Sequence, residues 1–246
     1  MDKLTAVIIT LNEERNIERC LNSLMEVADE IIVVDSGSTD ATKDICGKFE
    51  KLRFIDKEWI GYSETKNFAN QQADHSYILS IDADEALDES LTAMILQEKT
   101  KGLSGTYSFN RLTNYCGNWV RHGGWYPDPK LRIFPSAGTK WEGEIHEELL
   151  FETLLSNIHL NGDLLHYSYY SHQEHQERAN KYSRMSAQKL HHQGKKAGPL
   201  KPLFASMFKF IQMFILKAGF LDGLTGFHIA RISAAANYLK YKELRG

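Results

Sequence analysis

Short apolar segments alternate with segments of helical periodicity through the first hundred residues. Leu4–Thr10 (LTAVIIT) and Glu30–Asp35 (EIIVVD) are apolar and β-rich, which is typical of strands buried in a parallel sheet. Between them, residues 12–27 repeat apolar positions every three or four residues, which predicts a helix that Asn12 could cap. The same alternation continues with strands expected within 52–59 and 77–84, and helices within 40–49 and 63–74. This pattern predicts an α/β fold: a Rossmann-like, mainly parallel sheet with helices on both faces.

The character of the sequence changes in its second half. Residues 105–166 are rich in Tyr, Trp, Gly and Pro, which predicts antiparallel strands and loops beside the parallel sheet. From about residue 172 the pattern becomes helical. We therefore expect a sheet domain at 1–171, with halves 1–100 and 101–171, and a basic helical extension at 172–246.

Charge is unevenly distributed along the chain. The net charge is only −3, but residues 178–246 hold 13 of the 29 basic residues and two of the 32 acidic ones. Such a basic end could face nucleic acid or an anionic membrane. The cysteines Cys20, Cys46 and Cys116 form no CxxC pair, and the first apolar run is too short for a signal peptide. These features predict free thiols and a cytoplasmic protein.

The basic end contains an amphipathic segment, KPLFASMFKFIQMFILK. On a helical wheel its polar residues fall within roughly 160° of one another, and Leu, Phe, Met and Ile fill the remainder. The polar set is Lys201, Ser206, Lys209, Gln212 and Lys217. Lysines interrupt the segment too often for a transmembrane span, and its aromatic residues are not placed among the cations as nucleic-acid binding requires. We expect a peripheral membrane helix; the alternative is packing on the sheet domain or a second subunit.

Three predicted strands end in polar residues: Thr10-Leu11-Asn12, Asp35-Ser36-Gly37-Ser38 and Asp82-Ala83-Asp84. Ligands of parallel sheets bind at such carboxyl ends. Asp82 and Asp84 could reach one divalent cation, which would offset their repulsion, although a solvated loop is the simpler alternative. Asp35 could accept a hydrogen bond from a base or ribose, or its turn could merely cap a helix. Lys66 could meet a phosphate, or be an ordinary exposed helix lysine.

Two later segments also carry candidate chemistry. RHGGWYPDPKLRIF combines cations suited to a diphosphate with aromatic faces suited to sugar rings, although a β-hairpin with a core tryptophan would look similar. WEGEIHEEL offers several carboxylates, one of which could be a general base; a charged surface turn is the alternative. Its histidine does not complete the HExxH pattern of zinc sites.

These motifs together resemble family 2 glycosyltransferases of the GT-A fold. The segments TLNEERNIERCLNSL, IIVVDSGSTDAT, KNFAN and LSIDADE carry the resemblance over roughly residues 3–90, in order and spacing. Later segments, including GDLLHYSY and GFLDGLTGF, look like the bacterial branch that contains lipopolysaccharide core β-glucosyltransferases. The resemblance implies a nucleotide-sugar-binding first half, an acceptor-binding second half, and Mg²⁺ or Mn²⁺ as cofactor.

The resemblance also implies roles for individual residues. The donor nucleotide sugar would be held by Thr10, Leu11, Asn12, Glu14, Asp35, Ser36, Gly37, Lys66, Asp82, Ala83, Asp84 and Arg132, with Asp82 and Asp84 as the metal ligands. Donor or acceptor sugars would contact His122, Trp125, Tyr126 and Lys130. The family often places its base in an acidic pair such as ED, where this chain has HEE. We assign the base to Glu147, with Glu148 and Glu144 as alternates.

The expected activity is therefore metal-dependent, inverting sugar transfer from a UDP-sugar to a hydroxyl of a glycolipid or polysaccharide of the cell envelope. The enzyme would act at the inner face of the cytoplasmic membrane, without nucleic acid and with oligomerisation possible. A sugar-nucleotide pyrophosphorylase is one alternative, but TLNEERN stands where such enzymes carry a Gly-rich basic loop. A membrane-associated nucleotide-sugar-binding module without catalysis is the other.

Overall fold

The computed structural model describes residues 1–143 and 147–245 and divides the chain into two compact units. The first unit contains residues 1–111 and 129–166, and the second contains residues 112–128 and 167–246. The predicted boundary at 171/172 lies within a few residues of the observed boundary at 166/167. Residues 112–128, however, belong with the C-terminal helices and not with the sheet.

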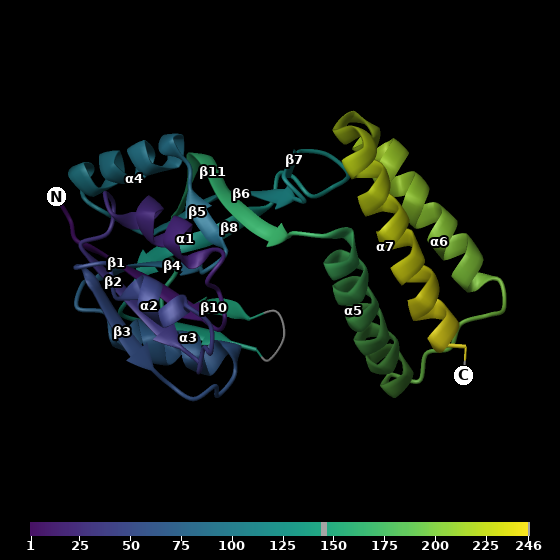
Figure 1. The fold of residues 1–246 in the computed structure, drawn as a ribbon, viewed down its shortest axis with the longest axis horizontal. Coiled ribbons are helices and arrows are strands. Elements are labelled where there is room, and N and C mark those ends of the chain that lie inside the picture. Colours follow the sequence, from purple (N-terminus) through teal and green to yellow (C-terminus); the bar gives the residue numbers. More distant parts are fainter. Residues whose placement is uncertain (144–146, 246) are drawn as a thin grey trace. The chain divides into compact units, whose positions relative to one another are not determined.

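The first unit is built on a mixed sheet with the strand order β3-β2-β1-β4-β8-β6-β11-β5 (Figure 1). Its parallel part comprises β1 (Leu4–Thr10), β2 (Glu30–Asp35), β3 (Leu52–Asp56) and β4 (Tyr77–Asp82). The remaining strands of the path are β5 (Glu85–Leu87), β6 (Thr106–Tyr115), β8 (Pro129–Pro135) and β11 (Asn157–Tyr169). β8 pairs antiparallel with both β4 and β6, and β5 pairs antiparallel with β11. The predicted α/β class and the antiparallel second half are confirmed.

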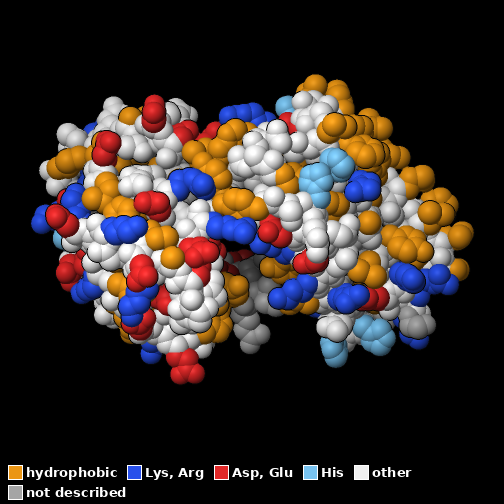
Figure 2. Space-filling model, viewed as in Figure 1, with side chains coloured by type: hydrophobic (Ala, Val, Ile, Leu, Met, Phe, Trp, Pro, Cys, Tyr) orange, Lys and Arg blue, Asp and Glu red, His pale blue; other side chains and the backbone are white. Residues whose placement is uncertain are grey.

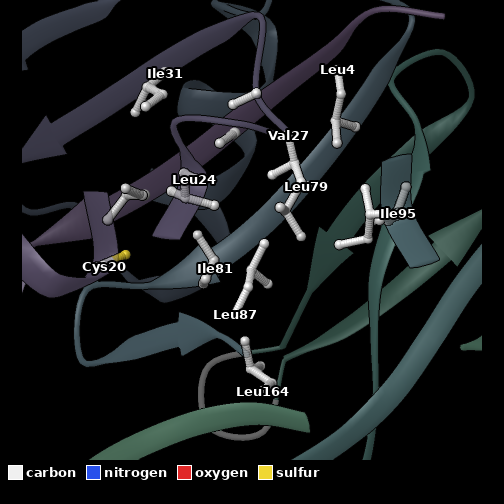
Figure 3. Packing of buried hydrophobic residues seen from close by; sticks show 14 of the residues in the cluster. Leu4, Cys20, Leu24, Val27, Ile31, Leu79, Ile81, Leu87, Ile95 and Leu164 are labelled. Carbon is white, nitrogen blue, oxygen red and sulfur yellow. The ribbon is translucent and has the colours of Figure 1, made fainter. Parts of the chain in front are cut away.

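Helices cover both faces of the parallel strands, because successive side chains of a strand point to opposite faces. The helices of this unit are α1 (Ile17–Leu24), α2 (Thr42–Cys46), α3 (Tyr62–Gln71) and α4 (Glu89–Lys101). On one face, α1, α2 and α4 pack on alternate residues of β1 and β4, such as Leu4 and Leu79 (Figure 3). On the other face, α3 packs on a second cluster together with the small sheet of β9 (Thr139–Glu142) and β10 (Glu148–Phe151).

Local sequence explains where these helices begin. Asp88 caps α4, because its Oδ1 accepts a hydrogen bond from the Leu91 backbone N–H at 2.7 Å. The helix expected from residue 12 begins only at Ile17. Asn12 has φ +55° and accepts a hydrogen bond from the Thr39 backbone N–H at 2.8 Å, so it ties two loops together and does not cap the helix.

The second unit is mainly helical. It contains β7 (Asn118–Val120), α5 (His172–His192), α6 (Lys201–Ile211), a π-helical turn η1 (Gln212–Leu216), a 3₁₀ turn η2 (Gly219–Asp222) and α7 (Gly223–Glu243). A capping box between Ser171 and Glu174 starts α5. Within the described residues, no single helix is long and apolar enough to cross a membrane. The segments Lys201–Leu216 and Gly219–Glu243 reach that length and composition only as a pair bent by 72°.

Candidate active site

A cavity of about 580 Å³ opens at the carboxyl ends of β1 and β4. The sheet register brings the predicted strand ends together, since Ile9 is the partner of Asp82 and Thr10 is the partner of Asp35. The described residues that line the cavity are Ile9, Thr10, Leu11, Glu13, Trp59, Tyr62, Lys66, Asp82, Ala83, Asp84 and Glu147. Six of the predicted donor-binding residues and the predicted base thus share one cavity. Ligands of parallel sheets bind at such an edge.

Lys66 lies between two carboxylates of this cavity. Its Nζ is 2.8 Å from Oε1 of Glu147 and 3.8 Å from Oδ1 of Asp82, and it lies 4.7 Å from the centre of the Trp141 ring. The lysine side chain is only 8% exposed, so it is not the ordinary surface lysine of the alternative interpretation. Burial raises the pKa of Glu147, but the hydrogen bond and charge of Lys66 outweigh it, and the net pKa is lowered. Glu147 is therefore ionised at neutral pH.

A second basic side chain contacts Asp82. Arg132 on β8 donates to Asp82 Oδ2 at 2.8 Å and to both oxygens of Glu85 at 2.6 and 2.7 Å. Glu85 is completely buried and also accepts from the Asp82 backbone N–H at 3.0 Å. Burial raises the pKa of Asp82, but Arg132 and Lys66 hold that pKa far below its ordinary range. Arg132 thus fixes Asp82 in its charged form from outside the cavity lining.

Asp84 has a different partner, His166 on β11. The Nε2 atom of His166 lies 3.2 Å from Asp84 Oδ2, and the buried Nδ1 atom of the same ring has no hydrogen-bond partner within the described residues. Asp82 and Asp84 are thus each held by a separate basic side chain. Both nevertheless line the cavity and offer carboxylate oxygens to it.

The loop after β2 is organised by Asp35. Its Oδ2 accepts hydrogen bonds from the backbone N–H groups of Gly37 and Ser38 at 3.0 and 2.7 Å, and its Oδ1 accepts one from the Ser38 hydroxyl. Gly37 has φ +93°, a conformation that favours glycine. Glu14 accepts from the Ala41 backbone N–H at 3.1 Å. Asp35, Ser36, Gly37, Asn12 and Glu14 shape the loops of this sheet edge but are not part of the cavity lining.

The four residues predicted to contact donor or acceptor sugars are divided between the two units. Lys130 lies on β8 in the first unit, whereas His122, Trp125 and Tyr126 belong to the second unit. There, His122 Nδ1 lies 2.8 Å from Asp222 Oδ1.

Glu148, the first alternate for the base, begins β10, is exposed and does not line the cavity. Glu144, the second alternate, lies outside the described residues. Glu147 is therefore the one of the three candidates that the structure places in the cavity wall.

Several site residues were not expected from the sequence. Trp59 and Tyr62 line the cavity, and their rings meet edge to face with centroids 4.7 Å apart. They follow a predicted strand, so the rule that ligands bind at strand ends could have found them. Glu85 and His166 carried no such signal, because their partners lie far along the chain.

The predicted metal ligands Asp82 and Asp84 both line the cavity, as do two further acidic residues, Glu13 and Glu147. Within residues 1–143 and 147–245, no cluster of three or more His, Cys, Asp and Glu side chains is arranged to hold a metal ion. Mg²⁺ and Mn²⁺ in substrate-bridging sites need fewer protein ligands, because diphosphate oxygens and water complete the shell. Two oxygen ligands at the edge of a cavity of this size fit that kind of site.

Comparisons with known proteins agree on one family. Residues 5–210 match the profile described as "Glycosyl transferase family 2". An uncharacterized glycosyltransferase of Rickettsia typhi is 31% identical, with 100% of this chain and 87% of the relative covered. The lipopolysaccharide core biosynthesis glycosyltransferase LpsC of Rhizobium meliloti is 29% identical, with 97% and 93% covered. The crystal structure of S. aureus TarS 1–349 covers 97% of this chain and 90% of that one, at 14% identity and a TM-score of 0.47.

Proposed function

The chain belongs to glycosyltransferase family 2 and has the GT-A fold, and on this premise we propose that it transfers a sugar from a nucleotide-diphosphate donor to an acceptor hydroxyl with inversion at the anomeric carbon. The donor is a UDP-sugar, and the acceptor is a glycolipid or polysaccharide of the cell envelope. The observation that carries the proposal is the cavity itself. Its lining contains two carboxylates that would suit a divalent cation, Asp82 and Asp84, and a paired lysine and glutamate, Lys66 and Glu147.

The donor diphosphate would bind at the Asp82–Asp84 side of the cavity. These two carboxylates would hold Mg²⁺ or Mn²⁺, which supplies charge neutralisation for the departing diphosphate when bound. Arg132 keeps Asp82 ionised and oriented, because its guanidinium bridges Asp82 to the buried Glu85. Lys66 adds a positive charge on the same side of the cavity, 3.8 Å from Asp82.

Glu147 is the proposed general base. Its carboxylate takes the proton of the acceptor hydroxyl while the acceptor oxygen attacks the anomeric carbon. The bond between that carbon and the diphosphate oxygen breaks, and its electron pair leaves with the nucleoside diphosphate. A single displacement of this kind inverts the configuration. When Lys66 turns toward the diphosphate, Glu147 loses its 2.8 Å partner and becomes a stronger base.

A role in lipopolysaccharide assembly is supported by one relative in particular. LpsC of Rhizobium meliloti, described as a lipopolysaccharide core biosynthesis glycosyltransferase, aligns with 97% of this chain. The alignment covers 97% of this chain and 93% of LpsC, so it includes the helical second unit as well as the sheet. We therefore propose a lipid-linked saccharide of the core type as the acceptor.

The test is a transfer assay with the full chain. A panel of UDP-sugars is incubated with Mn²⁺ and truncated lipopolysaccharide cores, and both nucleotide release and the mass of the glycan product are measured. We expect one UDP-sugar to give a product with a single added sugar of inverted anomeric configuration, and EDTA to abolish it. Binding of UDP-sugars without release or transfer on any acceptor would instead support a module that has lost catalysis.

A further inference from the structure

The outer side of α6 and η1 is apolar and exposed. Six large side chains there, each between 53% and 68% exposed, form what is called here the outer apolar surface: Leu203, Phe204, Met207, Phe208, Ile215 and Leu216. Figure 2 shows hydrophobic side chains gathered over the region of α6, which Figure 1 labels. An exposed apolar surface of this extent marks an interaction site in a natural protein.

Part of the polar side of the same helix faces α7. The Ser206 hydroxyl donates to the Ala234 carbonyl on α7 at 2.9 Å, and Asn237 on α7 donates to the Ala205 carbonyl at 2.8 Å. Lys209 and Gln212 are half-buried. α6 and η1 thus pack on α7 through these hydrogen bonds and through Phe210, Met213 and Phe214, which join an apolar cluster with Ile229 of α7. The six large side chains of the outer apolar surface remain exposed.

Cations surround this surface, whereas acidic side chains do not. Residues 195–245 contain nine Lys and Arg but only Asp222 and Glu243 as acids, and none of the residues from 196 to 221 is acidic. Asp222 is already engaged by His122 at 2.8 Å, and Glu243 by Arg184 at 3.2 Å. The surroundings of the outer apolar surface thus carry a net positive charge.

We propose that the outer apolar surface inserts into the headgroup region of an anionic bilayer, with α6 lying in the plane of the membrane. Exposed Leu, Phe and Met on one side of a helix and Lys beside them are what an interfacial segment requires. Lys201 and Lys217, at the two ends of α6–η1, would meet anionic headgroups. The source of such a surface in a cell is the inner face of the cytoplasmic membrane.

Two other occupants fit less well. A second copy of this chain would bring two cationic surfaces together, which charge repulsion opposes. A transmembrane path would require the pair bent by 72°, since no single helix of the described residues qualifies. The inference concerns a surface outside the reaction cavity and does not depend on the proposed sugar transfer.

The experiment is flotation of the full chain with vesicles of phosphatidylcholine, with and without phosphatidylglycerol. We expect binding to the anionic vesicles, weaker binding to the neutral ones, partial loss in high salt, and release by alkaline carbonate. Phe204→Ser and Phe208→Ser should each weaken binding roughly tenfold, because each removes one apolar side chain from the bilayer. Lys201→Gln with Lys217→Gln should reduce the preference for phosphatidylglycerol.

The matched control is Leu154→Ser, which changes a fully exposed leucine of the first unit and should leave flotation unchanged. Leu224→Ser is a second variant, and it should not affect folding because Leu224 on α7 is 78% exposed. Equal flotation of all variants, or absence of wild-type binding to anionic vesicles, would overturn the proposal. Binding that resists alkaline carbonate would also overturn it, because such resistance indicates a membrane-spanning segment. A stable dimer in solution that Phe204→Ser and Phe208→Ser dissociate would overturn it as well. Transfer to water-soluble acceptors, measured in parallel, separates this outcome from failure of the enzyme.

Discussion

Lys66 Nζ lies 2.8 Å from Glu147 Oε1, so the proposed base forms a salt bridge with a lysine of the same cavity. The two residues come from α3 and from the segment just before β10, on the face of the sheet where those elements pack together. The same Lys66 ammonium is 3.8 Å from Asp82. It therefore lies between Asp82, on the proposed donor side of the cavity, and Glu147, the proposed base. Binding of a diphosphate can therefore change the basicity of Glu147.

Replacement of Lys66 tests its two proposed roles, which are binding of the donor diphosphate and lowering of the pKa of Glu147. Lys66→Met removes the charge and keeps the volume of a side chain that is 8% exposed. We expect weaker UDP binding and a loss in kcat of about 100-fold, as for removal of one electrostatic contact in an active site. Since Lys66 lowers the pKa of Glu147, its removal raises that pKa, and the acidic limb of the kcat/KM profile should move to higher pH.

The matched control for this change is Lys43→Met. Lys43 also pairs with a carboxylate, Asp56 at 2.8 Å, but both partners are more than 60% exposed and neither lines the cavity. Its kinetic constants and pH profile should equal those of the wild type. An unshifted acidic limb in Lys66→Met would contradict the coupling between Lys66 and Glu147.

The choice of base is tested by comparing adjacent glutamates. Glu147→Gln should lower kcat by about 10²- to 10⁴-fold, the usual contribution of general base catalysis, with UDP affinity retained. Glu148→Gln should be nearly silent, since Glu148 is an exposed residue of β10 outside the cavity lining. Full turnover in Glu147→Gln, together with loss in Glu148→Gln or Glu144→Gln, would move the role to another carboxylate.

The metal site is tested by binding, independently of turnover. In titrations of UDP against the wild type, Mn²⁺ should strengthen binding and EDTA should reverse the effect, because diphosphate and cation share the site. Asp84→Asn should abolish the Mn²⁺ dependence while leaving the metal-free affinity unchanged. If Asp84→Asn still responds to Mn²⁺ as the wild type does, Asp84 is not a ligand. Glu89→Gln, a change at the first residue of α4, is the control.

The buried pair of Glu85 and Arg132 is expected to matter for stability. Glu85→Gln removes the fully buried carboxylate from Arg132, which is 7% exposed and keeps Asp82 at 2.8 Å as a partner. Hydrogen bonds to charged groups contribute about 1.5–3 kcal/mol each, so we expect a loss of about 2–3 kcal/mol. Urea unfolding measures this cost. The double variant Glu85→Leu, Arg132→Met removes both charges of the pair but leaves Asp82 with only Lys66 at 3.8 Å, so it should recover part of the loss.

An exposed pair provides the comparison. Asp56→Asn removes the partner of Lys43 at the surface and should cost less than about 1 kcal/mol. Equal costs for Glu85→Gln and Asp56→Asn would contradict this expectation, because they would show that Asp82 alone compensates the charge of Arg132.

Much of this architecture could be predicted from the sequence, because its signals are local. The apolar runs at Leu4–Thr10 and Tyr77–Asp82 mark buried strands, and parallel pairing then brings their polar ends to one edge. Partners distant along the chain have no such signal: neither the pairing of Glu85 with Arg132 nor that of Asp84 with His166 follows from any period or motif.

The tail shows a second limit of sequence-based prediction. Its helical period predicts a polar side and an apolar side, but the structure buries Met213 of the apolar set and leaves Lys201 and Lys217 of the polar set exposed. Contacts between helices, such as the hydrogen bond from Ser206 to the Ala234 carbonyl, decide which residues face inward, and the helical period does not show them. The helix also ends its α-helical part at Ile211, where the π-helical turn begins.

The aromatic pair Trp59–Tyr62 should contribute to donor binding. Trp59 is 44% exposed at the cavity, and its ring meets that of Tyr62 edge to face. We expect the exposed part of the indole to stack on the donor base. Stacking of a base on such a ring is worth about 1–3 kcal/mol, so Trp59→Ala should weaken UDP binding roughly 5- to 100-fold. UDP should also quench tryptophan fluorescence in the wild type and quench it less in the variant. Trp119→Ala alters a 37%-exposed tryptophan of the second unit that packs on Tyr167, and should leave UDP affinity unchanged. The contrary outcome is that Trp59→Ala binds UDP as tightly as the wild type and raises only the KM of the acceptor. That result would mean that Trp59 and Tyr62 contact the acceptor sugar, and that the donor base binds elsewhere along the edge formed by β1 and β2.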